Sequence, residues 1–143
     1  LYGAATLAGA ALGRFRGPAG ITWTRTNHSR LIFDGLEVRA VRDLSHVSES
    51  TLRAMADARI GGFAPNLPNG QPIVLHHLGQ RPYGPIVEMP ANAHRITHPV
   101  QHPFGNQPGF GLSPQQREAF NLWRADYWRA RAVEELARRG VRL

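Results

Sequence analysis

The sequence predicts an α+β fold, with short strands in the first two thirds of the chain and one long helix at its C-terminal end. An apolar run precedes Asp34-Gly35 and alternating apolar residues follow it, and this dipeptide favours the positive φ angles of a tight hairpin turn. A second strand-like run, residues 72–78, carries two adjacent histidines. Residues 113–140 repeat aromatic and arginine side chains at helical spacing. Together these patterns predict an N-terminal hairpin, a short helix, a second hairpin and a long C-terminal helix.

The 143-residue chain is long enough for one domain preceded by a leader. Residues 1–20 are rich in alanine and glycine and indicate a linker or leader, and residues 21–143 are expected to form the single domain. The apolar start is too short to span a bilayer and lacks the basic front of a signal peptide, so we expect no stable membrane insertion. Because the chain starts without methionine, we expect a fragment or a processed product.

Three strand-like runs follow the leader. Residues 21–26 are rich in β-branched and aromatic side chains, which favour a strand. Residues 31–33 and 36–41 form the two legs of the Asp34-Gly35 hairpin, and the apolar side chains at positions 36, 38 and 40 are expected on one face.

A short helix is predicted over residues 48–58. Ser48 is its expected N-cap, because a serine side chain can accept a hydrogen bond from a free N–H of the first turn. The residues expected to face the core are Leu52, Met55 and Ala56. Gly61-Gly62 is expected to end the helix.

A second hairpin follows a turn rich in proline and glycine at residues 64–70. Residues 72–78 are expected to form its first strand, residues 79–84 its turn and residues 85–89 its second strand. Residues 90–112 contain several prolines and glycines and are expected to be irregular.

The C-terminal segment gives the clearest helix signal. Ser113 and Gln116 form a capping box with proline at the first helical position, and Gly140 stands where a C-terminal cap belongs. One face is expected to carry Phe120, Trp123, Tyr127 and Ala130. Arginines recur every seven residues and are expected to form a second stripe, at positions 117, 124, 131 and 138.

The charge balance is strongly basic. The formal net charge is +7 at pH 7, and all 17 basic residues are arginine. Arginine binds phosphate through a planar fork of donors, so nucleic acid or an acidic protein is the expected partner, although a GC-rich genome would equally explain the missing lysine. The absence of cysteine excludes disulfides, thiolate zinc sites and cysteine nucleophiles, and the absence of lysine excludes Schiff-base chemistry.

Five of the seven histidines lie within one short stretch of the chain: His76, His77, His94, His98 and His102. His76 and His77 are neighbours on a strand, so their side chains point to opposite faces, and one can bind a metal while the other acts as a base. The last three are spaced four residues apart, a spacing that returns to one helical face. These residues predict a metal site in a basic domain, whereas His28 and His46 are expected to be surface or core filler.

Several short motifs follow one another in a fixed order: Leu75-His76-His77, Gln80, Gly84-Pro85-Ile86-Val87-Glu88, His94 and His102-Pro103-Phe104-Gly105-Asn106. In this order they resemble the LHH group of toxin nucleases, which belongs to the HNH/endonuclease VII (His-Me finger) superfamily. The segment from Phe120 to Ala132 is also similar to the closing helix of that group. The resemblance covers residues 43–137 and implies a ββα-metal nuclease core, in a C-terminal toxin domain of bacterial polymorphic toxins such as Rhs proteins.

The resemblance implies a role for each histidine of the cluster. His77 would activate the attacking water, and His76 would bind the metal together with His94 and one later histidine. That later ligand is either His98, at the four-residue spacing of the related colicin DNases, or His102, which the HPFGN motif favours. An exchange of roles between His76 and His77 also stays open.

One divalent ion is the implied cofactor. Imidazole ligands suit zinc, nickel or manganese better than magnesium, and the identity of the ion stays open. Glu88 would complete the metal shell or orient a histidine for catalysis, and an ion pair with an arginine such as Arg81 or Arg95 is the equal alternative. Gln80 would bind phosphate or, as we prefer, stabilise the turn.

Some arginines of the last helix lack obvious local partners and are the candidates for nucleic-acid phosphate contact: Arg117, Arg124 and Arg129. Two i,i+4 ion pairs are expected further along, Glu134–Arg138 and Glu135–Arg139. Three aromatic side chains are expected in the core rather than stacked on bases: Trp123, Tyr127 and Trp128.

Residues and resemblance together predict a metal-dependent endonuclease that hydrolyses the phosphodiester bonds of DNA. The expected partners are DNA, a cognate immunity protein, and a parent Rhs-type toxin with its secretion apparatus. The expected role is that of a secreted effector domain that acts in the cytoplasm of a target bacterial cell during interbacterial competition. Two alternatives stay open: a non-catalytic nucleic-acid-binding module with a structural metal site, and an RNase that uses the same site.

Overall fold

The computed structural model describes residues 13–16, 22–81, 83–94 and 111–143, and these residues form a mixed α+β fold, as expected. The strands are β1 (Gly13–Arg16), β2 (Thr22–Asn27), β3 (Arg30–Phe33), β4 (Leu36–Arg39), β5 (Ile73–His77) and β6 (Ile86–Pro90). The helices are α2 (Glu49–Ala56) and α3 (Pro114–Arg138), with short 3₁₀ helices η2 (Leu78–Gln80) and η3 (Ala91–Ala93).

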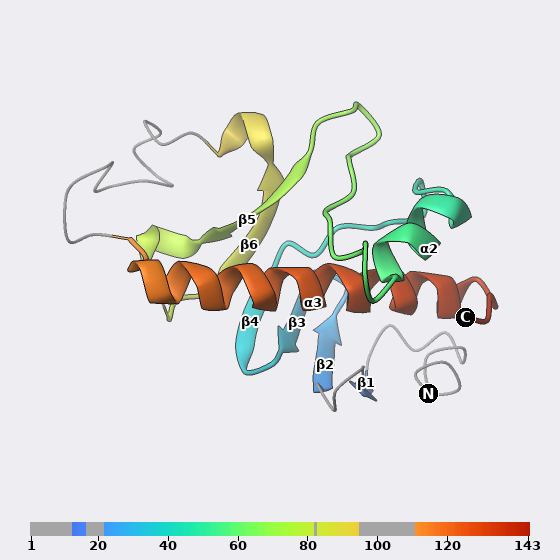
Figure 1. Ribbon diagram of the computed structural model, residues 1–143, viewed down its shortest axis with the longest axis horizontal. Helices are drawn as coiled ribbons and strands as arrows, with labels where there is room; N and C mark the ends of the chain where they lie inside the picture. Colours follow the sequence, from blue (N-terminus) through green and yellow to red (C-terminus); the bar gives the residue numbers. More distant parts are fainter. Residues whose placement is uncertain (1–12, 17–21, 82, 95–110) are drawn as a thin grey trace.

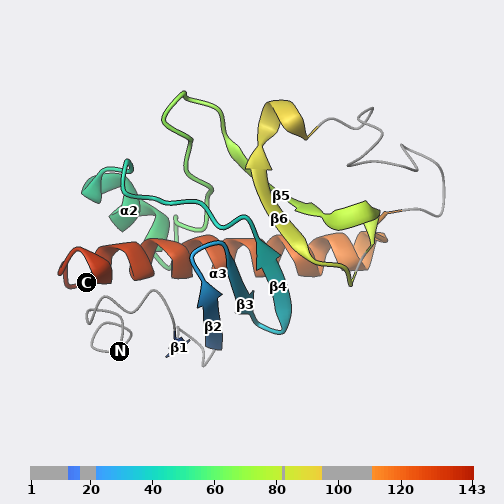
Figure 2. The ribbon, with the colours of Figure 1, turned by 180° about the vertical axis from the view of Figure 1, so that it is seen from behind.

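The strands form one sheet in the order β1-β2-β3-β4-β6-β5. Neighbouring strands are antiparallel except β4 and β6, which run parallel because the chain passes through α2 and β5 before it returns as β6. The long helix α3 runs along one side of this sheet, and α2 packs against the C-terminal half of α3 (Figures 1 and 2). The β5–β6 hairpin lies at the other end of α3, beside its N-terminus.

The sheet begins earlier than expected, because β1 lies within the residues predicted to form a linker. β1 pairs antiparallel with β2, from Gly13 opposite Arg25 to Arg16 opposite Thr22. The four residues of β1 include only one large apolar side chain, Phe15, so the alternation that signals a strand is too short to be detected in the sequence.

The Asp34-Gly35 hairpin is present as predicted. Both turn residues have positive φ, 47° for Asp34 and 82° for Gly35, and they join β3 to β4 in antiparallel register. The second strand is shorter than predicted, because Ala40 adopts a φ of 55° and leaves the β conformation. Val38 is buried but Ala40 is exposed, so the predicted alternation stops before position 40.

The predicted short helix is confirmed as α2. The Ser48 side chain accepts a hydrogen bond from the Thr51 N–H at 3.1 Å and so caps the first turn. Leu52 and Met55 are buried, and Ala56 packs against the core, as expected. The helix ends at Ala56, before the predicted residue 58.

Gly61-Gly62 does not end α2 directly, because Asp57 already has an extended conformation with a ψ of 134°. The glycines instead shape the turn after the helix, where the Gly62 N–H donates to the Met55 carbonyl at 2.9 Å. Gly62 has a φ of 86°, and a Cβ at this position would lie 2.8 Å from the Cβ of Ala125 on α3. Glycine at position 62 therefore allows the turn to approach α3 closely.

The core lies between the sheet and α3. Phe33 of β3 packs edge-on against both Trp123 and Tyr127, with ring centroids 5.5 Å apart in each pair. The indole N–H of Trp123 also donates to the Phe33 carbonyl at 3.2 Å. Trp128 is buried as well. The aromatic side chains of α3 are therefore core residues, as predicted, and do not offer stacking surfaces to bases.

α3 begins and ends where the sequence predicts. The Ser113 hydroxyl accepts from the Gln116 N–H at 3.1 Å, and the Gln116 side chain accepts from the Ser113 N–H at 2.9 Å, which completes the capping box. Gly140, with a φ of 77°, follows the last turn. Among the described residues, no helix combines the length and the apolar character needed to cross a membrane.

The arginines at seven-residue spacing do not form the continuous second stripe that was predicted. Arg131 is buried and bound to Glu88. Arg117 and Arg124 are exposed on the N-terminal half of α3. The stripe is not continuous because seven residues of an α-helix fall about 20° short of two full turns, and at Arg131 the helix face meets β6.

One of the two predicted i,i+4 ion pairs is also wrong. Glu134 does not bind Arg138; its carboxylate binds the guanidinium of Arg25 on β2, at 2.5 and 2.9 Å. The Glu134 side chain faces the sheet, where a partner distant in sequence is closer than the next turn of the helix. The other pair, Glu135–Arg139, is present at 2.9 Å.

Candidate functional site

The β5–β6 hairpin carries the candidate site. Its register pairs His77 with Ile86 and His76 with Val87. Directly paired residues of an antiparallel ladder share a face, so His77 lies on the face of Ile86, which belongs to the core beneath α3. His76 lies on the opposite face. The two adjacent histidines therefore point to opposite sides of the sheet, as their positions on one strand predict.

His76 meets His94 on the face away from α3. The chain leaves β6 through η3, where the Ala91 N–H donates to the Pro72 carbonyl at 2.9 Å and fastens η3 to the start of β5. This return brings His94 Nε2 to 2.8 Å from His76 Nδ1, with ring centroids 4.6 Å apart. His76 is buried, with 3% of its surface exposed. The structure thus joins two predicted metal ligands that are 18 residues apart in sequence.

The donor set of this histidine pair fits a transition-metal ion. Neutral imidazole nitrogens are common ligands of zinc, nickel and related ions. Two nitrogens that share a tetrahedral zinc ion, each about 2.0–2.1 Å from it, lie roughly 3.3 Å apart. The observed separation of 2.8 Å would need only a small opening of the pair. His76 and His94 are therefore the described residues best suited to hold such an ion.

The remaining predicted ligands lie outside the described residues. His98 and His102 both fall within residues 95–110, where the helix of a ββα-metal core would also have to follow η3. Within the described ranges, no group of three or more histidine, cysteine, aspartate or glutamate side chains is arranged to hold a metal ion. A full ligand set needs a contribution from residues 95–110, and the choice between His98 and His102 stays a prediction.

His77 has a different environment, against α3. Its ring centroid lies 4.5 Å from that of Phe120, and Phe120 stacks in turn on Trp123 at 5.6 Å. Burial lowers the pKa of His77 below its ordinary value, and the positive charge of Arg117 lowers this pKa further. The imidazole of His77 is therefore predominantly neutral at neutral pH, which is the form that accepts a proton.

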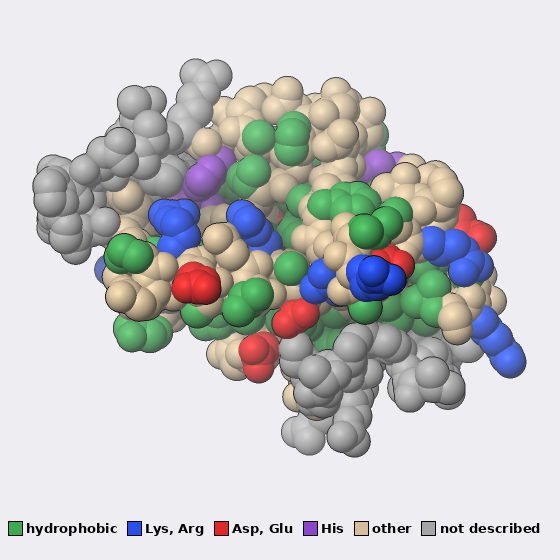
Figure 3. Space-filling model, in the orientation of Figure 1, with side chains coloured by type: hydrophobic (Ala, Val, Ile, Leu, Met, Phe, Trp, Pro, Cys, Tyr) green, Lys and Arg blue, Asp and Glu red, His purple; other side chains and the backbone are tan. Residues whose placement is uncertain are grey.

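Two exposed arginines flank Phe120 on α3. Arg117 precedes it by three residues and Arg124 follows it by four, so the three side chains share one side of the helix. Neither arginine forms an ion pair with any residue that the structure describes. Arginine side chains lie beside a histidine over this part of α3 in the space-filling view (Figure 3). The helix face next to His77 is thus basic and exposed.

The third predicted phosphate contact, Arg129, has a different position. Its Nε donates to the Asp57 carbonyl at 3.0 Å, and its Nη2 donates to the Gly61 carbonyl at 3.2 Å. These bonds fasten the turn after α2 to α3. Because its donors are used within the fold, Arg129 is less suited to bind phosphate than the two exposed arginines.

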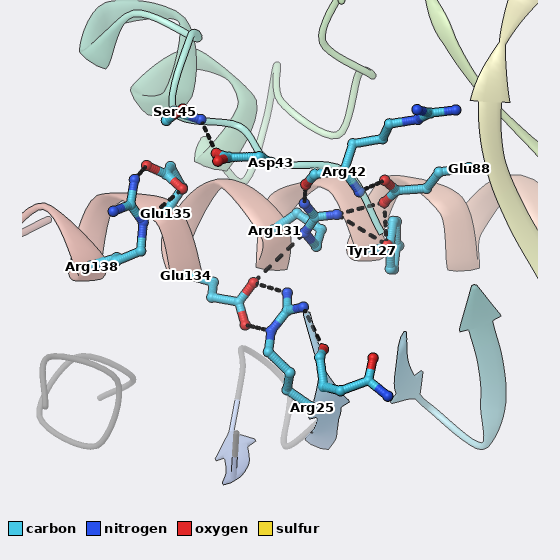
Figure 4. Close-up of polar contacts among 11 residues, drawn as sticks. Arg25, Arg42, Asp43, Ser45, Glu88, Tyr127, Arg131, Glu134, Glu135 and Arg138 are labelled. Atoms are coloured by element: carbon cyan, nitrogen blue, oxygen red, sulfur yellow. Dashed lines mark hydrogen bonds and ion pairs between the residues drawn. The ribbon is translucent and has the colours of Figure 1, made fainter. Parts of the chain in front are cut away.

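Glu88 is fully buried, on the sheet face opposite His76, and Figure 4 shows its polar contacts. Arg131 and the Tyr127 hydroxyl each donate to Glu88 Oε2 at 2.5 Å. The Arg42 backbone N–H donates to Oε1 at 2.6 Å. Both carboxylate oxygens are therefore engaged by α3 and by the segment after β4, and no contact joins Glu88 to a described histidine.

Of the two alternatives for Glu88, the structure favours the buried ion pair, with a partner other than those expected. The partner is Arg131 of α3. Arg81 forms no ion pair within the described residues, and Arg95 lies outside them. Glu88 therefore joins the hairpin to α3 and lies on the sheet face opposite the histidine pair, where it does not reach an ion held by that pair.

The charges of this buried network stabilise one another. Burial disfavours the charge of Arg131, but the neighbouring Glu88 carboxylate, with Tyr127 and Glu134, outweighs this effect and raises the pKa of Arg131. Burial, and then the charge of Glu88, raise the pKa of Tyr127 well above its ordinary value. The phenol therefore stays protonated and can donate to Glu88.

Sequence reasoning missed Arg131 and Tyr127 as partners of Glu88. The two residues are one turn apart on α3, so their spacing shows that they share a face. Their partner lies 39 residues before Tyr127 and 43 residues before Arg131, and no local pattern connects a strand residue to a helix face at that distance. Phe120 was predicted to face the core, but no pattern in the sequence indicated that its ring would contact His77.

A comparison with known protein families identifies the class of protein. Residues 56–134, more than half of the chain, match a family described as nucleases of the HNH/ENDO VII superfamily with conserved LHH. The chain therefore belongs to the HNH/ENDO VII nuclease superfamily. Within that superfamily it is a member of the LHH family, in agreement with Leu75-His76-His77 at the end of β5. No curated protein and no solved structure matches the chain.

Proposed function

We propose that the chain is a metal-dependent endonuclease that hydrolyses phosphodiester bonds of DNA. The observation that carries this proposal is the end of β5, where a buried histidine pair lies on one face and a neutral histidine beside an exposed arginine lies on the other. Membership of a nuclease superfamily supports hydrolysis of nucleic acid. DNA is the proposed substrate because the chain has a net charge of +7 and its sequence contains no recognised RNA-binding signature.

His77 is the proposed general base. Hydrolysis requires a water molecule to lose a proton while its oxygen attacks phosphorus and the bond to the departing oxygen breaks. A neutral imidazole can accept that proton, and the lowered pKa keeps His77 neutral. The ring of Phe120 packs against His77 and limits its rotation, so the accepting nitrogen keeps one orientation.

His76 and His94 would hold one divalent ion, with a further ligand from His98 or His102. When bound, such an ion supplies a Lewis acid that stabilises negative charge on the departing oxygen. An imidazole donor set favours zinc, nickel or manganese over magnesium. His76 is committed to His94 on the face away from α3, which supports His76 as ligand and His77 as base instead of the exchanged roles.

Arg117 and Arg124 would bind the backbone of the DNA strand. Seven residues of helix separate them by about 10 Å along the axis, so each would contact a different phosphate. The planar guanidinium matches two phosphate oxygens at once, which fixes orientation as well as affinity. These contacts would place a phosphodiester next to His77, because Phe120 lies between the two arginines and touches His77.

The biological setting is proposed from the resemblance to toxin nucleases. In that setting the chain is a secreted effector domain of a larger Rhs-type toxin and acts in the cytoplasm of a competing bacterium. A cell that makes such an enzyme must protect its own DNA, which requires a cognate immunity protein. Because the helix face beside His77 is basic, we expect the partner to bind it through an acidic surface.

The test is a cleavage assay with the purified chain. Supercoiled plasmid and a structured RNA are incubated separately with zinc, nickel, manganese or magnesium, with and without EDTA. We expect metal-dependent plasmid cleavage that His77→Ala reduces by about 100-fold or more. His28→Ala is the matched control, because His28 is exposed and distant in sequence from the site. Plasmid left intact under every metal would contradict the proposal, and RNA cleaved alone would favour the RNase alternative.

A further inference from the structure

The turn between β5 and β6 presents an aromatic and a cationic side chain to solvent. Tyr83 has 86% of its surface exposed, and its ring makes no contact with another described ring. Arg81, two residues earlier, is exposed and forms no ion pair with the described residues. Single exposed apolar residues are common on proteins, so exposure alone assigns no role to Tyr83.

The turn is closed by backbone hydrogen bonds. The Leu78 N–H donates to the Pro85 carbonyl at 2.9 Å, and the Gly84 N–H donates to the Arg81 carbonyl at 3.1 Å. Gly79 and Gln80 both have positive φ, 67° and 57°, so their backbones form part of the turn. The described residues of the turn are therefore held in place before any ligand binds, and ordering them costs little on binding.

The turn lies next to the proposed catalytic base. It starts directly after His77, and its second leg returns at Ile86, the residue paired with His77. Tyr83 precedes Ile86 by three residues, a distance of at most about 11 Å along an extended chain. Both ribbon views place this turn beside the N-terminal end of α3, the end that carries Arg117 (Figures 1 and 2). One end of the molecule thus combines His77, the exposed tyrosine and exposed arginines.

We propose that this turn is a second contact for the DNA strand, in which the Tyr83 ring stacks on a base and Arg81 binds a neighbouring phosphate. The inference rests on the proposed nuclease function and names a positioning contact for it. Bases and phosphates alternate along a nucleic-acid strand, and the turn offers an exposed ring and an exposed cation two residues apart in the sequence. Every base has a π face, so this contact adds affinity and orientation without sequence preference.

The experiment measures DNA binding in the His77→Ala background, in which the bound strand is not cut. The probe is a short oligonucleotide with the fluorescent base 2-aminopurine placed in turn at successive positions. Tyr83→Ala should weaken binding roughly 10-fold, as expected for loss of one stacked base. Tyr83→Phe should bind like the parent, because it keeps the ring. Tyr83→Leu should behave like Tyr83→Ala, because it keeps apolar surface but cannot stack.

Two further variants make the result specific. Arg81→Ala should lower the slope of log affinity against log salt by about one, as expected for one lost phosphate contact. Ile60→Ala is the matched control, because Ile60 is 74% exposed but lies in the turn after α2, where Asp57 and Gly61 bind Arg129, about three turns along α3 from Arg117. Its affinity should stay unchanged.

The outcomes separate this inference from the proposed function. If the parent binds and cuts DNA while Tyr83→Ala binds as tightly as Tyr83→Phe, the stacking contact is wrong and the nuclease proposal stands. Quenching of 2-aminopurine that persists in Tyr83→Ala would also overturn the contact. If the parent neither binds nor cuts DNA, the proposed function fails and this inference fails with it.

Discussion

At the scale of single residues, His76 and His77 show how the environment of a side chain decides its chemistry. They are neighbours in the chain and identical in type, yet they lie on opposite faces of β5. His76 lies against another imidazole, a position suited to a shared cation. His77 lies against an aromatic ring and near an arginine, a position that keeps it neutral. The same residue type therefore supports two different proposed roles.

Replacing Arg117 with glutamine should move the acidic limb of the pH–rate profile to higher pH. The positive charge of Arg117 disfavours the protonated form of His77, so its removal raises the pKa of His77. A general base is active when neutral, and the activity is lost as the pH falls through that pKa. The raised pKa places this loss at higher pH. The measurement is kcat/KM for oligonucleotide cleavage against pH.

Arg124→Gln is the matched control for this shift. Arg124 shares the helix face with Arg117 but makes no contribution to the lowered pKa of His77. Arg124→Gln should weaken DNA binding and leave the acidic limb in place. If the limb stays in place in Arg117→Gln as well, His77 is not the group that titrates in the reaction.

Replacing either member of the histidine pair should weaken metal binding. Loss of one outer partner of a metal site commonly costs about 10- to 100-fold in affinity, and loss of a direct ligand should cost at least as much. His76→Ala and His94→Ala are therefore expected to lower zinc affinity by at least this factor in isothermal titration calorimetry. His46→Ala is the control, because the His46 ring forms a hydrogen bond with the Asn66 carbonyl and is not part of the His76–His94 pair. Equal affinity in all variants would exclude this pair as ligands.

At the scale of elements, the site depends on how α3 holds the β5–β6 hairpin. The polar connection is the buried Glu88–Arg131 pair, with exposed fractions of 0% and 5% for the two side chains. Arg131 also donates to the Arg42 carbonyl, so the same guanidinium joins β6, α3 and the segment after β4. His77 and Glu88 lie on the same face of the hairpin, and both meet α3. The helix thus fixes the hairpin at two places.

Breaking this pair should destabilise the fold. Glu88→Gln leaves the charge of Arg131 buried without its carboxylate, a change that typically costs about 3–5 kcal/mol. We expect the urea midpoint to fall with little change in the m value. The exposed pair Glu49–Arg53 of α2 provides the control, and Glu49→Gln should cost less than about 1 kcal/mol. Similar losses in both variants would show that burial of the Glu88–Arg131 pair has no special weight.

The elements were predictable where a local rule defines them. The capping box at Ser113, the turn at Asp34-Gly35 and the cap at Ser48 each depend on a few consecutive residues, and each is present. β1 was missed because its strand signal is very short. The Glu134–Arg25 pair was missed because it depends on which face of α3 meets the sheet. Turns and helix caps depend on a few neighbouring residues and can be predicted from them. Contacts across the core depend on how the helices pack against the sheet.

The same distinction applies to the site. The motif and the opposite orientation of His76 and His77 follow from their positions on one strand. The meeting of His76 with His94 depends on how η3 folds back on β5, which no spacing rule predicts. Glu88 forms an ion pair with an arginine, one of the two expected alternatives, because its face of the hairpin meets α3. Nearness in sequence was a poor guide to nearness in space for this carboxylate.

At the scale of the whole molecule, the formal net charge is +7, and ion pairs decide which of the arginines stay available to a ligand. Many arginines are partly or wholly neutralised by carboxylates: Arg25, Arg30, Arg39, Arg53, Arg129, Arg131, Arg138 and Arg139. The arginines near His77 have no such partner among the described residues. These arginines would attract a polyanion to the end of the molecule that carries the proposed base.

Removal of metal should abolish activity without unfolding the chain. The core between the sheet and α3 is built from apolar side chains of β2–β6 and α3, and it includes neither His76 nor His94. Metal binding adds stability only by mass action, about 2.7 kcal/mol at a free concentration of 100 times Kd. Chelation should therefore lower Tm by several degrees, leave the far-ultraviolet circular dichroism spectrum at room temperature unchanged, and stop DNA cleavage.

A structural metal site predicts a different result from the same chelation experiment. In a module whose fold depends on the ion, removal of the ion unfolds the chain, and the helical circular dichroism signal is lost together with DNA binding. Here α3 is stabilised by its own capping box and by the aromatic contacts with β3, none of which involves the histidine pair. We therefore expect the chelated chain to keep its helical signal and to bind DNA through Arg117 and Arg124 without cutting it. Loss of the helical signal on chelation would favour the non-catalytic module over the nuclease.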